Sequence, residues 1–585
     1  MKWNLSVFYQ NDAQWQKDYD LLKGHIASLG TFKGKLNNYD DFLAYHMANE
    51  ELTLLFYKVY PYASLGSDLN LKDPNKNNLR QQVYYLFSLV NQTTAYASPE
   101  IISIGQKKVM GFCQKDPLLK TYQFVYEKLF RSQEHILDEK GETILANFAN
   151  ASNIVTSLHQ SLAIVDRTNE TVVLSDGTNV EVSSANYAQL MENSLCDADR
   201  QLIFNALYKR YADNKSAFAA TYELALKKLE SNYKSRGFNS ALEAKLYGDN
   251  IPVSVFKTLT ETTYENTHLL KRYFELRRQI LGLKKHNFYD RLLPLAKTDK
   301  KYTYEESYKL FVDSIKGMDK EFVDAQLQSL ADGYVDVLPG DGKRTGAYSM
   351  GLYGSNPFIL LNHNDTLDAL FTLAHEAGHS AHTLLSNQNQ PLAVADYTIF
   401  VAEIASTFNE HILLDHLLKK CESKSEKIVL LQQAIDAICA TFYRQTLFAT
   451  YEDRANELLA SGQPINEQSL SQIFIDLYQH YYDIDITKEG QLRLEWAHVP
   501  HFFNSPFYVY QYATSFAASL KIYDNIKSGK KGAFNDFIGL LKSGGSDYPV
   551  NQAKKAGADL TNKETILAVF KRFEQLLDLL EETIK

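Results

Sequence analysis

Cysteine is scarce in this sequence, with four residues among 585 (Cys113, Cys196, Cys421 and Cys439). They lie far apart and form no CxxC pair, which argues against a disulfide scaffold and predicts reduced thiols in a reducing compartment. Glycine (27) and proline (13) are also few for this length, as expected of a mostly helical chain. No run of about 18 apolar residues occurs, so we predict no membrane span.

Charge of one sign is not concentrated anywhere in the chain. Lys and Arg total 61 against 70 Asp and Glu, and no dense basic run occurs, which argues against a nucleic-acid partner. With 45% apolar residues the chain is too apolar for intrinsic disorder. The first residues lack a basic segment followed by a long apolar one, which argues against a secretory signal. We therefore predict a cytoplasmic protein with no nucleic-acid, membrane or obligate protein partner.

Helical periodicity dominates what is present. Within residues 264–283, Leu269, Tyr273, Leu276 and Ile280 recur at intervals of three and four, the pattern of an amphipathic helix. Similar stripes run through 200–235, 305–330, 428–460 and 562–582. The fold class predicted is mainly α, with a soft domain boundary near residue 190 that separates 1–190 from a helical body at 191–585.

Strand signals are few and fall in two places. Alternating residues around Asp176-Gly177 predict a small hairpin or meander formed by Ile164–Arg167, Thr171–Leu174 and Asn179–Val182. A second β region is predicted over 334–362, from Tyr334–Leu338 to Phe358–Leu361. Because this region directly precedes the most informative helix, we interpret Phe358–Leu361 as an edge strand on which a peptide could lie.

That helix, predicted over Thr366–Ser386 with Asp365 or Thr366 as its N-cap, contains the motif His-Glu-Ala-Gly-His at 375–379. Two histidines at i and i+4 share one helix face, so both imidazoles can reach one zinc ion. Glu376 lies about 100° round the helix from His375, where it can approach a water without ligating the metal. The alternative to a zinc site is a surface helix in which the two histidines have no shared function.

A catalytic zinc site needs a third protein ligand. His382 lies seven residues from His375, about 10 Å along the axis, which is too far for one tetrahedral centre. Glu403 is the better candidate, because it stands among apolar and small residues in the next predicted helix, 398–419, where an unpaired carboxylate would be costly. Glu410 returns to the same face seven residues later and could orient a ligand histidine. An ordinary salt-bridged carboxylate is the alternative for Glu403.

Four sequence blocks, one of which contains this motif, resemble a known family. The blocks are GKRTGAYS at 342–349, FTLAHEAGHSAH at 371–382, WAHVPHFFNSPFYVYQYATS at 496–515 and KSGGSDYP at 542–549, with Glu403 28 residues after the first histidine of the motif. They resemble the gluzincin peptidases of the thimet oligopeptidase family, and most closely the oligoendopeptidase F group. The resemblance implies that His375, His379 and Glu403 bind one zinc ion and that Glu376 is the general base. It also implies an N-terminal helical lobe that closes over the body around a channel for unfolded oligopeptides.

The block at 496–515 crowds histidines and tyrosines together. Tyr O–H and His N–H groups can stabilise the oxyanion of peptide hydrolysis, and the resemblance maps this pair to His501 and Tyr512. Tyr508 and Tyr510 are competing choices, and we predict that His498 and Tyr510 contact substrate. In a chain with 38 tyrosines, local packing is the plain alternative.

The Gly-flanked segment 342–353 lacks the GxxxxGK[ST] pattern of a phosphate loop. We interpret it as a loop that binds the substrate backbone, with Gly346 and Tyr348 in contact. The function predicted is a zinc-dependent oligoendopeptidase acting on short peptides. Three alternatives remain: a dipeptidyl carboxypeptidase, a peptide-binding protein with a vestigial site, and a structural zinc protein.

Overall fold

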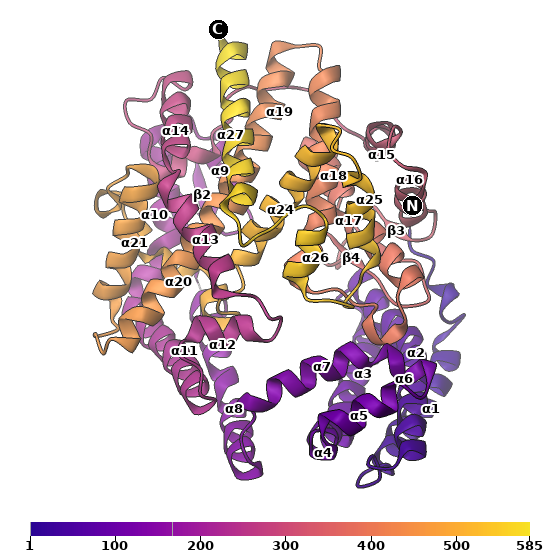
Figure 1. The fold of residues 1–585 in the computed structure, drawn as a ribbon. Helices are drawn as coiled ribbons and strands as arrows, with labels where there is room; N and C mark the ends of the chain where they lie inside the picture. Colours follow the sequence, from indigo (N-terminus) through magenta and orange to yellow (C-terminus); the bar gives the residue numbers. More distant parts are fainter. Residues whose placement is uncertain (1, 167) are drawn as a thin grey trace. The chain divides into compact units, whose positions relative to one another are not determined.

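The computed structural model describes residues 2–166 and 168–585 (Figure 1). Helices dominate these ranges and the strands form two small sheets, which confirms the mainly α class. Contacts divide the chain into two compact units, each built from three segments: Met1–Glu134, Lys300–Leu417 and Ile522–Gly557 in unit 1, and His135–Asp299, Leu418–Lys521 and Ala558–Lys585 in unit 2. The boundary near residue 190 lies inside unit 2 and, as a statement about domains, stays a prediction.

Unit 1 is helical at its N-terminal segment and carries the motif helix in its second segment. The first segment holds α1 (Asp12–Gly30), α2 (Tyr39–Leu69), α3 (Pro74–Thr94), α4 (Ala97–Ile104), α5 (Gln106–Cys113), α6 (Pro117–Thr121) and α7 (Gln123–Ser132). The other two hold α15 (Tyr304–Ile315), α16 (Lys320–Ser329), α17 (Leu367–Asn389), α18 (Ile399–Lys420), α25 (Ala533–Lys542) and α26 (Pro549–Lys555). Both α16 and α25 pack on α17.

Unit 2 begins with α8 (Glu139–Gln160), which runs into a π-helical turn at Ser161–Val165. Its helices before residue 300 are α9 (Tyr187–Asn193), α10 (Asp197–Asp213), α11 (Lys215–Ser235), α12 (Ala241–Tyr247), α13 (Val253–Glu265) and α14 (His268–Ile280). Those after residue 417 are α19 (Lys424–Ala437), α20 (Arg444–Ala460), α21 (Glu467–Tyr482), α22 (Glu495–His498), α23 (His501–Asn504), α24 (Tyr510–Lys527) and α27 (Lys563–Ile584). A π-helical turn, Ile438–Tyr443, joins α19 to α20.

The hairpin of unit 2 consists of β1 (Glu170–Val173) and β2 (Asn179–Val182), paired antiparallel with Val173 opposite Asn179. This confirms the hairpin around Asp176-Gly177. A third strand over Ile164–Arg167 is wrong where the structure describes it, because Ile164 and Val165 end the π-helical turn that extends α8. Arg167 lies outside the described residues. These two apolar residues belong to the end of a helix, and so short an apolar run has no periodicity that distinguishes a strand from a helix.

The sheet of unit 1 has three strands, β3 (Val335–Asp336), β4 (Tyr348–Met350) and β5 (Phe358–Leu360), in the order β3-β5-β4. The prediction that Phe358–Leu361 is an edge strand is therefore wrong: β5 is central, parallel to β3 and antiparallel to β4. All three residues of β5 are buried, and such an uninterrupted apolar run is typical of a strand covered on both faces. The edge next to α17 is β4 instead.

The backbone of β4 turns away from β5 at one position. Ile359 donates its N–H to Tyr334 O at 2.8 Å, so Ile359 faces β3 and its neighbours Phe358 and Leu360 face β4. Ser349 stands opposite Ile359, and in an antiparallel pair its N–H and C=O consequently turn away from β5.

The beginning of the chain is tied to this sheet. Trp3 donates its indole N–H to Ile359 O at 2.9 Å, with Tyr334 O at 3.1 Å, and packs with Leu65, Phe358 and Leu360. The backbone N–H of Asn4 donates to Gly333 O at 2.8 Å. Unit 1 is thus closed by contacts between residues more than 300 positions apart in sequence.

Among the described residues, no helix combines the length and the apolar character that crossing a membrane would require.

Candidate metal centre and its surroundings

Three donors converge where α17 meets α18. His375 Nε2 lies 3.2 Å from Glu403 Oε2, His379 Nε2 lies 3.3 Å from the same oxygen, and the two Nε2 atoms are 3.2 Å apart. Zinc bonds of about 2.0–2.1 Å in a tetrahedron set neighbouring ligand atoms about 3.3 Å apart. Two imidazole nitrogens and one carboxylate oxygen are also the donor types that zinc takes at catalytic centres. The residues present therefore fit a zinc ion.

A close crossing of the two helices brings these donors together. Gly378 lies within the motif on α17, and a Cβ built there would meet Ala405 O and Ser406 Cα at 2.6 Å. Asn409, one and a half turns beyond Glu403 on α18, donates its amide N–H to Ala374 O at 2.9 Å. The side chain of Glu403 reaches the histidines because the backbones touch at Gly378.

A second carboxylate contacts one of the three candidate donors. His375 Nδ1 lies 2.6 Å from Glu410 Oε1, the position from which a carboxylate fixes the tautomer of a metal-binding imidazole. Burial alone would lower the pKa of His375, but the hydrogen bonds and charges of Glu403 and Glu410 outweigh it and raise that pKa well above its usual range. Although burial opposes it, the two imidazoles hold the pKa of Glu403 well below its usual range.

Glu376 is the carboxylate of the motif and lies outside the group of three donors. Its side chain is 6% exposed, and burial is the main cause of its raised pKa, offset in part by His375 and His379. One of its oxygens, Oε2, has no hydrogen-bond partner among the described residues. A buried carboxylate with a free lone pair beside three metal donors is placed to take a proton.

His382 packs rather than ligates. It is fully buried, and its ring lies 3.7 Å from the ring of Tyr397 with 5° between the planes. Burial lowers its pKa to about 3. His382 lies outside the group of three donors, as its seven-residue spacing from His375 predicts.

The other predicted group lies in unit 2, on the segment from α22 to α24. The ring of His501 stacks on Tyr508 with centroids 5.8 Å apart and planes at 4°, and Tyr512 meets Tyr508 edge to face at 5.5 Å. These three side chains are partly exposed, whereas Tyr510 is 2% exposed and packs against Phe256. Burial lowers the pKa of His501, which keeps the imidazole neutral.

Two protein-family models match this chain. The family model described as peptidase family M3 matches residues 190–572. The chain belongs to peptidase family M3. The model described as oligopeptidase F matches residues 100–168, in the N-terminal part. The protein is accordingly a metallopeptidase, a hydrolase of peptide bonds.

Relatives of this M3 peptidase resemble it along the whole chain. Oligopeptidase PepF of Bacillus subtilis (strain 168) is 32% identical over 584 residues, covering 100% of this chain and 87% of the relative. The crystal structure of oligoendopeptidase-F from Enterococcus faecium superposes with a TM-score of 0.76 at 28% identity and covers 98% and 99% of the two chains. A solved structure from Chlamydophila abortus gives a TM-score of 0.89 at 32% identity, covering 100% and 98%.

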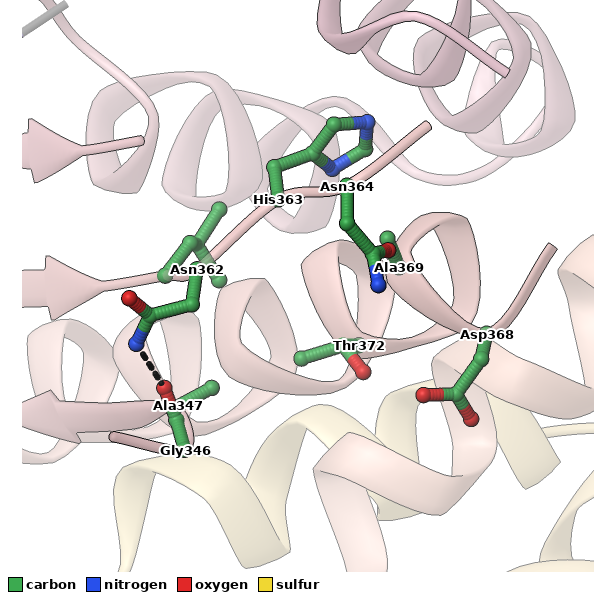
Figure 2. Close-up of a pocket in the computed structure, with 9 residues that line it drawn as sticks. Gly346, Ala347, Asn362, His363, Asn364, Asp368, Ala369 and Thr372 are labelled. Carbon is green, nitrogen blue, oxygen red and sulfur yellow. Dashed lines mark hydrogen bonds between the residues drawn. The ribbon is translucent and has the colours of Figure 1, made fainter. Parts of the chain in front are cut away.

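In the M3 peptidase, Gly346 lines a pocket between the start of β4 and the start of α17 (Figure 2). Its φ of +82° is the left-handed conformation that glycine adopts freely, and Asn362 donates its amide N–H to Gly346 O at 2.7 Å. The other lining residues are Ala347, Leu361, Asn362, His363, Asn364, Asp368, Ala369 and Thr372. In Figure 2 the side chains of Asp368 and Thr372 lie on the helix side of this pocket.

Tyr348, predicted with Gly346, occupies the first position of β4. Its hydroxyl donates to Asp68 Oδ2 at 2.8 Å, and the same buried carboxylate pairs with Arg80 and Arg344, each at 3.2 Å. Asp68 belongs to α2, so the N-terminal segment holds the strand that flanks α17. The hydroxyl of Tyr348 is therefore already engaged within the protein.

His498 and Lys343 are likewise held by their surroundings. The ring of His498 packs between Tyr208 and Tyr211 at 5.6 and 5.4 Å, and its burial lowers its pKa to about 4. Lys343 is buried, with Nζ 2.6 Å from both Asp336 Oδ1 and Leu338 O. Because its ammonium is satisfied internally, Lys343 is not a phosphate ligand, which agrees with the absence of the phosphate-loop pattern.

Sequence reasoning missed Gly378, Asn409 and Asp68. Only Gly378 carried a signal, because a glycine in the middle of a buried helix is costly unless another backbone approaches it closely. Asn409 and Asp68 are single polar residues within helices, and their partners lie 35 and up to 280 positions away.

Proposed function

We propose that this peptidase is a zinc-dependent oligoendopeptidase that hydrolyses internal bonds of short, unfolded peptides. The observation that carries the proposal is the trio of donors at 3.2–3.3 Å with a buried, unpaired carboxylate at Glu376 beside them. His375, His379 and Glu403 would hold the ion. When bound, zinc supplies Lewis acidity toward a carbonyl oxygen and lowers the pKa of a water.

Glu376 is the general base in this proposal. It accepts the proton of the attacking water at Oε2 and later passes it to the nitrogen of the leaving amine. Its raised pKa favours both steps, since a base closer to neutrality holds a proton long enough to deliver it. Glu410 keeps His375 in the tautomer whose Nε2 lone pair faces Glu403.

Oxyanion stabilisation is assigned to His501 with Tyr508 or Tyr512. Their partial exposure supports this role, since a hydroxyl or N–H must reach the substrate. The burial of Tyr510 and the packing of His498 favour supporting roles for those two residues. A neutral His501 can donate an N–H without first taking up a proton.

A peptide substrate would lie along the free edge of β4. Ser349 offers an outward N–H and C=O there, and its hydroxyl lies 2.7 Å from that of Ser380, the residue after His379. A strand added at this edge therefore passes beside the zinc donors. Past Tyr348 it would cross Gly346, where the pocket of Figure 2 can receive a side chain. A channel between an N-terminal lobe and the body, and a cytoplasmic location, stay predictions.

Two alternatives are disfavoured by specific observations. A structural zinc site is closed by four protein ligands, and the group found among the described residues offers three. A vestigial site would have no reason to keep Glu376. A dipeptidyl carboxypeptidase shares the zinc donors but requires a free C-terminus, so the ends of the substrate distinguish it.

The test uses a peptide of about ten residues blocked at both ends, incubated with the wild type and with Glu376→Gln. General acid–base groups contribute about 10²- to 10⁴-fold, so turnover measured by mass spectrometry should fall by that factor while zinc content is unchanged. Turnover that survives in Glu376→Gln would contradict the assignment of the base. Cleavage of the unblocked peptide alone would select the carboxypeptidase.

A further inference from the structure

The segment that carries His501 is anchored at its first residue by α20 and α21. Glu495, which opens α22, is fully buried and forms an ion pair with Arg444 and accepts the hydroxyl of Tyr478. Trp496 donates its indole N–H to Ser471 at 3.1 Å. These contacts fix the start of the segment in the core of unit 2, six residues before His501.

The other end of the segment is held by a second carboxyl group of α20. Glu452 is 1% exposed, and its Oε1 accepts the backbone N–H of Phe507 at 2.8 Å. Phe507 adopts φ of +56°, which is uncommon for a bulky residue and persists only where the surroundings impose it. Its ring is buried against Phe256 at 5.9 Å. Phe507 directly precedes Tyr508, whose ring stacks on His501.

We propose that Glu452 is a positioning residue for the peptidase reaction: its hydrogen bond holds Phe507 in the left-handed conformation that turns Tyr508 onto His501. This inference rests on the oxyanion role proposed for His501. The reversal of the chain at Phe507 sets the direction of Tyr508 relative to α23, so an extended backbone there would separate the two rings. Glu452 itself is buried and acts through its contact with the Phe507 backbone.

The carboxyl group acts through its shape rather than through charge. Burial raises the pKa of Glu452 to about 8, with Lys245 and the Phe507 N–H opposing that rise, so the group is mostly neutral at pH 7. Its Oε2 has no partner among the described residues. A glutamine side chain keeps an oxygen for the Phe507 N–H and has nearly the same volume. An alanine removes that acceptor.

The experiment measures kcat, KM and zinc content of the full chain on the blocked peptide for Glu452→Ala and Glu452→Gln. We expect kcat of the alanine variant to fall by roughly 10- to 100-fold, the scale of a small misplacement of catalytic groups, with zinc content unchanged and KM within about twofold. The glutamine variant should keep most of the wild-type kcat. Leu447→Ala, a buried truncation on the same helix, controls for loss of stability.

The double variant Glu452→Ala/His501→Ala separates positioning from general damage. If Glu452 acts through His501, the double variant loses no more activity than His501→Ala alone. Additive losses, an equal loss in Leu447→Ala, or a glutamine variant as impaired as the alanine variant would each overturn the inference. A wild type without peptidase activity, or a His501→Ala variant with full activity, would instead refute the proposed function on which the inference rests.

Discussion

Two histidine-bearing regions of this peptidase are built in different ways. The three candidate metal donors on α17 and α18 are placed by helix geometry and by one close backbone crossing at Gly378. Between Glu495 and Phe507 the chain that carries His501 forms only two short helices, α22 and α23, and buried side chains distant in sequence hold it at both ends. Residue spacing along a helix predicts which side chains share a face and can bind one metal ion. An irregular segment depends on buried contacts with distant residues, which spacing in the sequence does not predict.

Among the changes considered, replacing Gly378 by alanine should have the largest effect on zinc binding and peptidase activity. The added methyl group would meet backbone atoms of α18 at 2.6 Å, so the helices must separate and carry Glu403 away from the histidines. Overpacking of this kind costs about 1–3 kcal/mol or more. We expect loss of zinc and at least a hundredfold loss of peptidase activity, measured by metal analysis and peptide turnover.

Gly24→Ala is the matched control, because Gly24 lies inside α1 and a Cβ there meets nothing within 4 Å. That change should leave zinc content and activity unaltered and raise the free energy of unfolding by about 0.5–1 kcal/mol. A fully metallated, active Gly378→Ala protein would show that the crossing is not required.

The irregular segment should respond next most strongly. His501→Ala is expected to lower kcat by about 10²- to 10³-fold, as for loss of one oxyanion donor. Tyr508→Phe and Tyr512→Phe test which hydroxyl assists. Tyr510→Phe should change only the unfolding midpoint, since that side chain is buried. Zinc content should stay constant in all four proteins, and a drop in any of them would contradict the separation of the two regions.

Zinc affinity should depend on pH at the helix crossing. In the metal-free chain Glu403 and Glu410 raise the pKa of His375, so its imidazole is protonated at neutral pH and must release that proton to bind metal. Affinity should therefore rise with pH up to that pKa, by up to tenfold per unit, and fall as pH decreases. Competition with a chelator at a series of pH values measures this slope.

Glu410→Gln sharpens the same measurement. Removing one of the two carboxylates lowers the pKa of His375, so the pH at which affinity levels off should move down. At high pH the affinity itself should fall about 10- to 100-fold, because the tautomer of His375 is no longer fixed. An unchanged pH dependence would show that Glu410 does not control the protonation of His375.

The smallest effect is expected at the pocket beside β4, on the preference for one substrate side chain over another. Asp368 lines it and is exposed, so a lysine side chain placed there would gain about 0.2–1 kcal/mol from the charge pair. Asp368→Asn should reduce the preference for lysine over norleucine at one substrate position by roughly two- to fivefold. Asp365 lies three residues away and does not line the pocket. Asp365→Asn also removes one negative charge, and it should leave the preference for lysine over norleucine unchanged.

These differences also explain what could be predicted from the sequence. The histidine pair of the motif and Glu410 were predicted from helical spacing, and Glu403 from its apolar neighbours and the family resemblance. Helices α17 and α18 lie within three residues of their predicted ends. The order of the three strands did not follow, because β4 has three residues and pairs with β5 across a loop. The anchors Glu452 and Asp68 were equally hidden, since a buried carboxyl is recognisable only once its distant partner is known.

The contact between Trp3 and Ile359 has a consequence for the timing of synthesis. Unit 1 gathers chain segments that end at Gly557, and its α25 covers the metal-binding helix. At roughly 5–20 residues per second, a ribosome needs about half a minute to two minutes to travel from the first of these segments to the last. Until then the motif helix lacks one of its supports. The metal-binding helix therefore gains its full packing only after α25 has been synthesised, more than 140 residues beyond the motif.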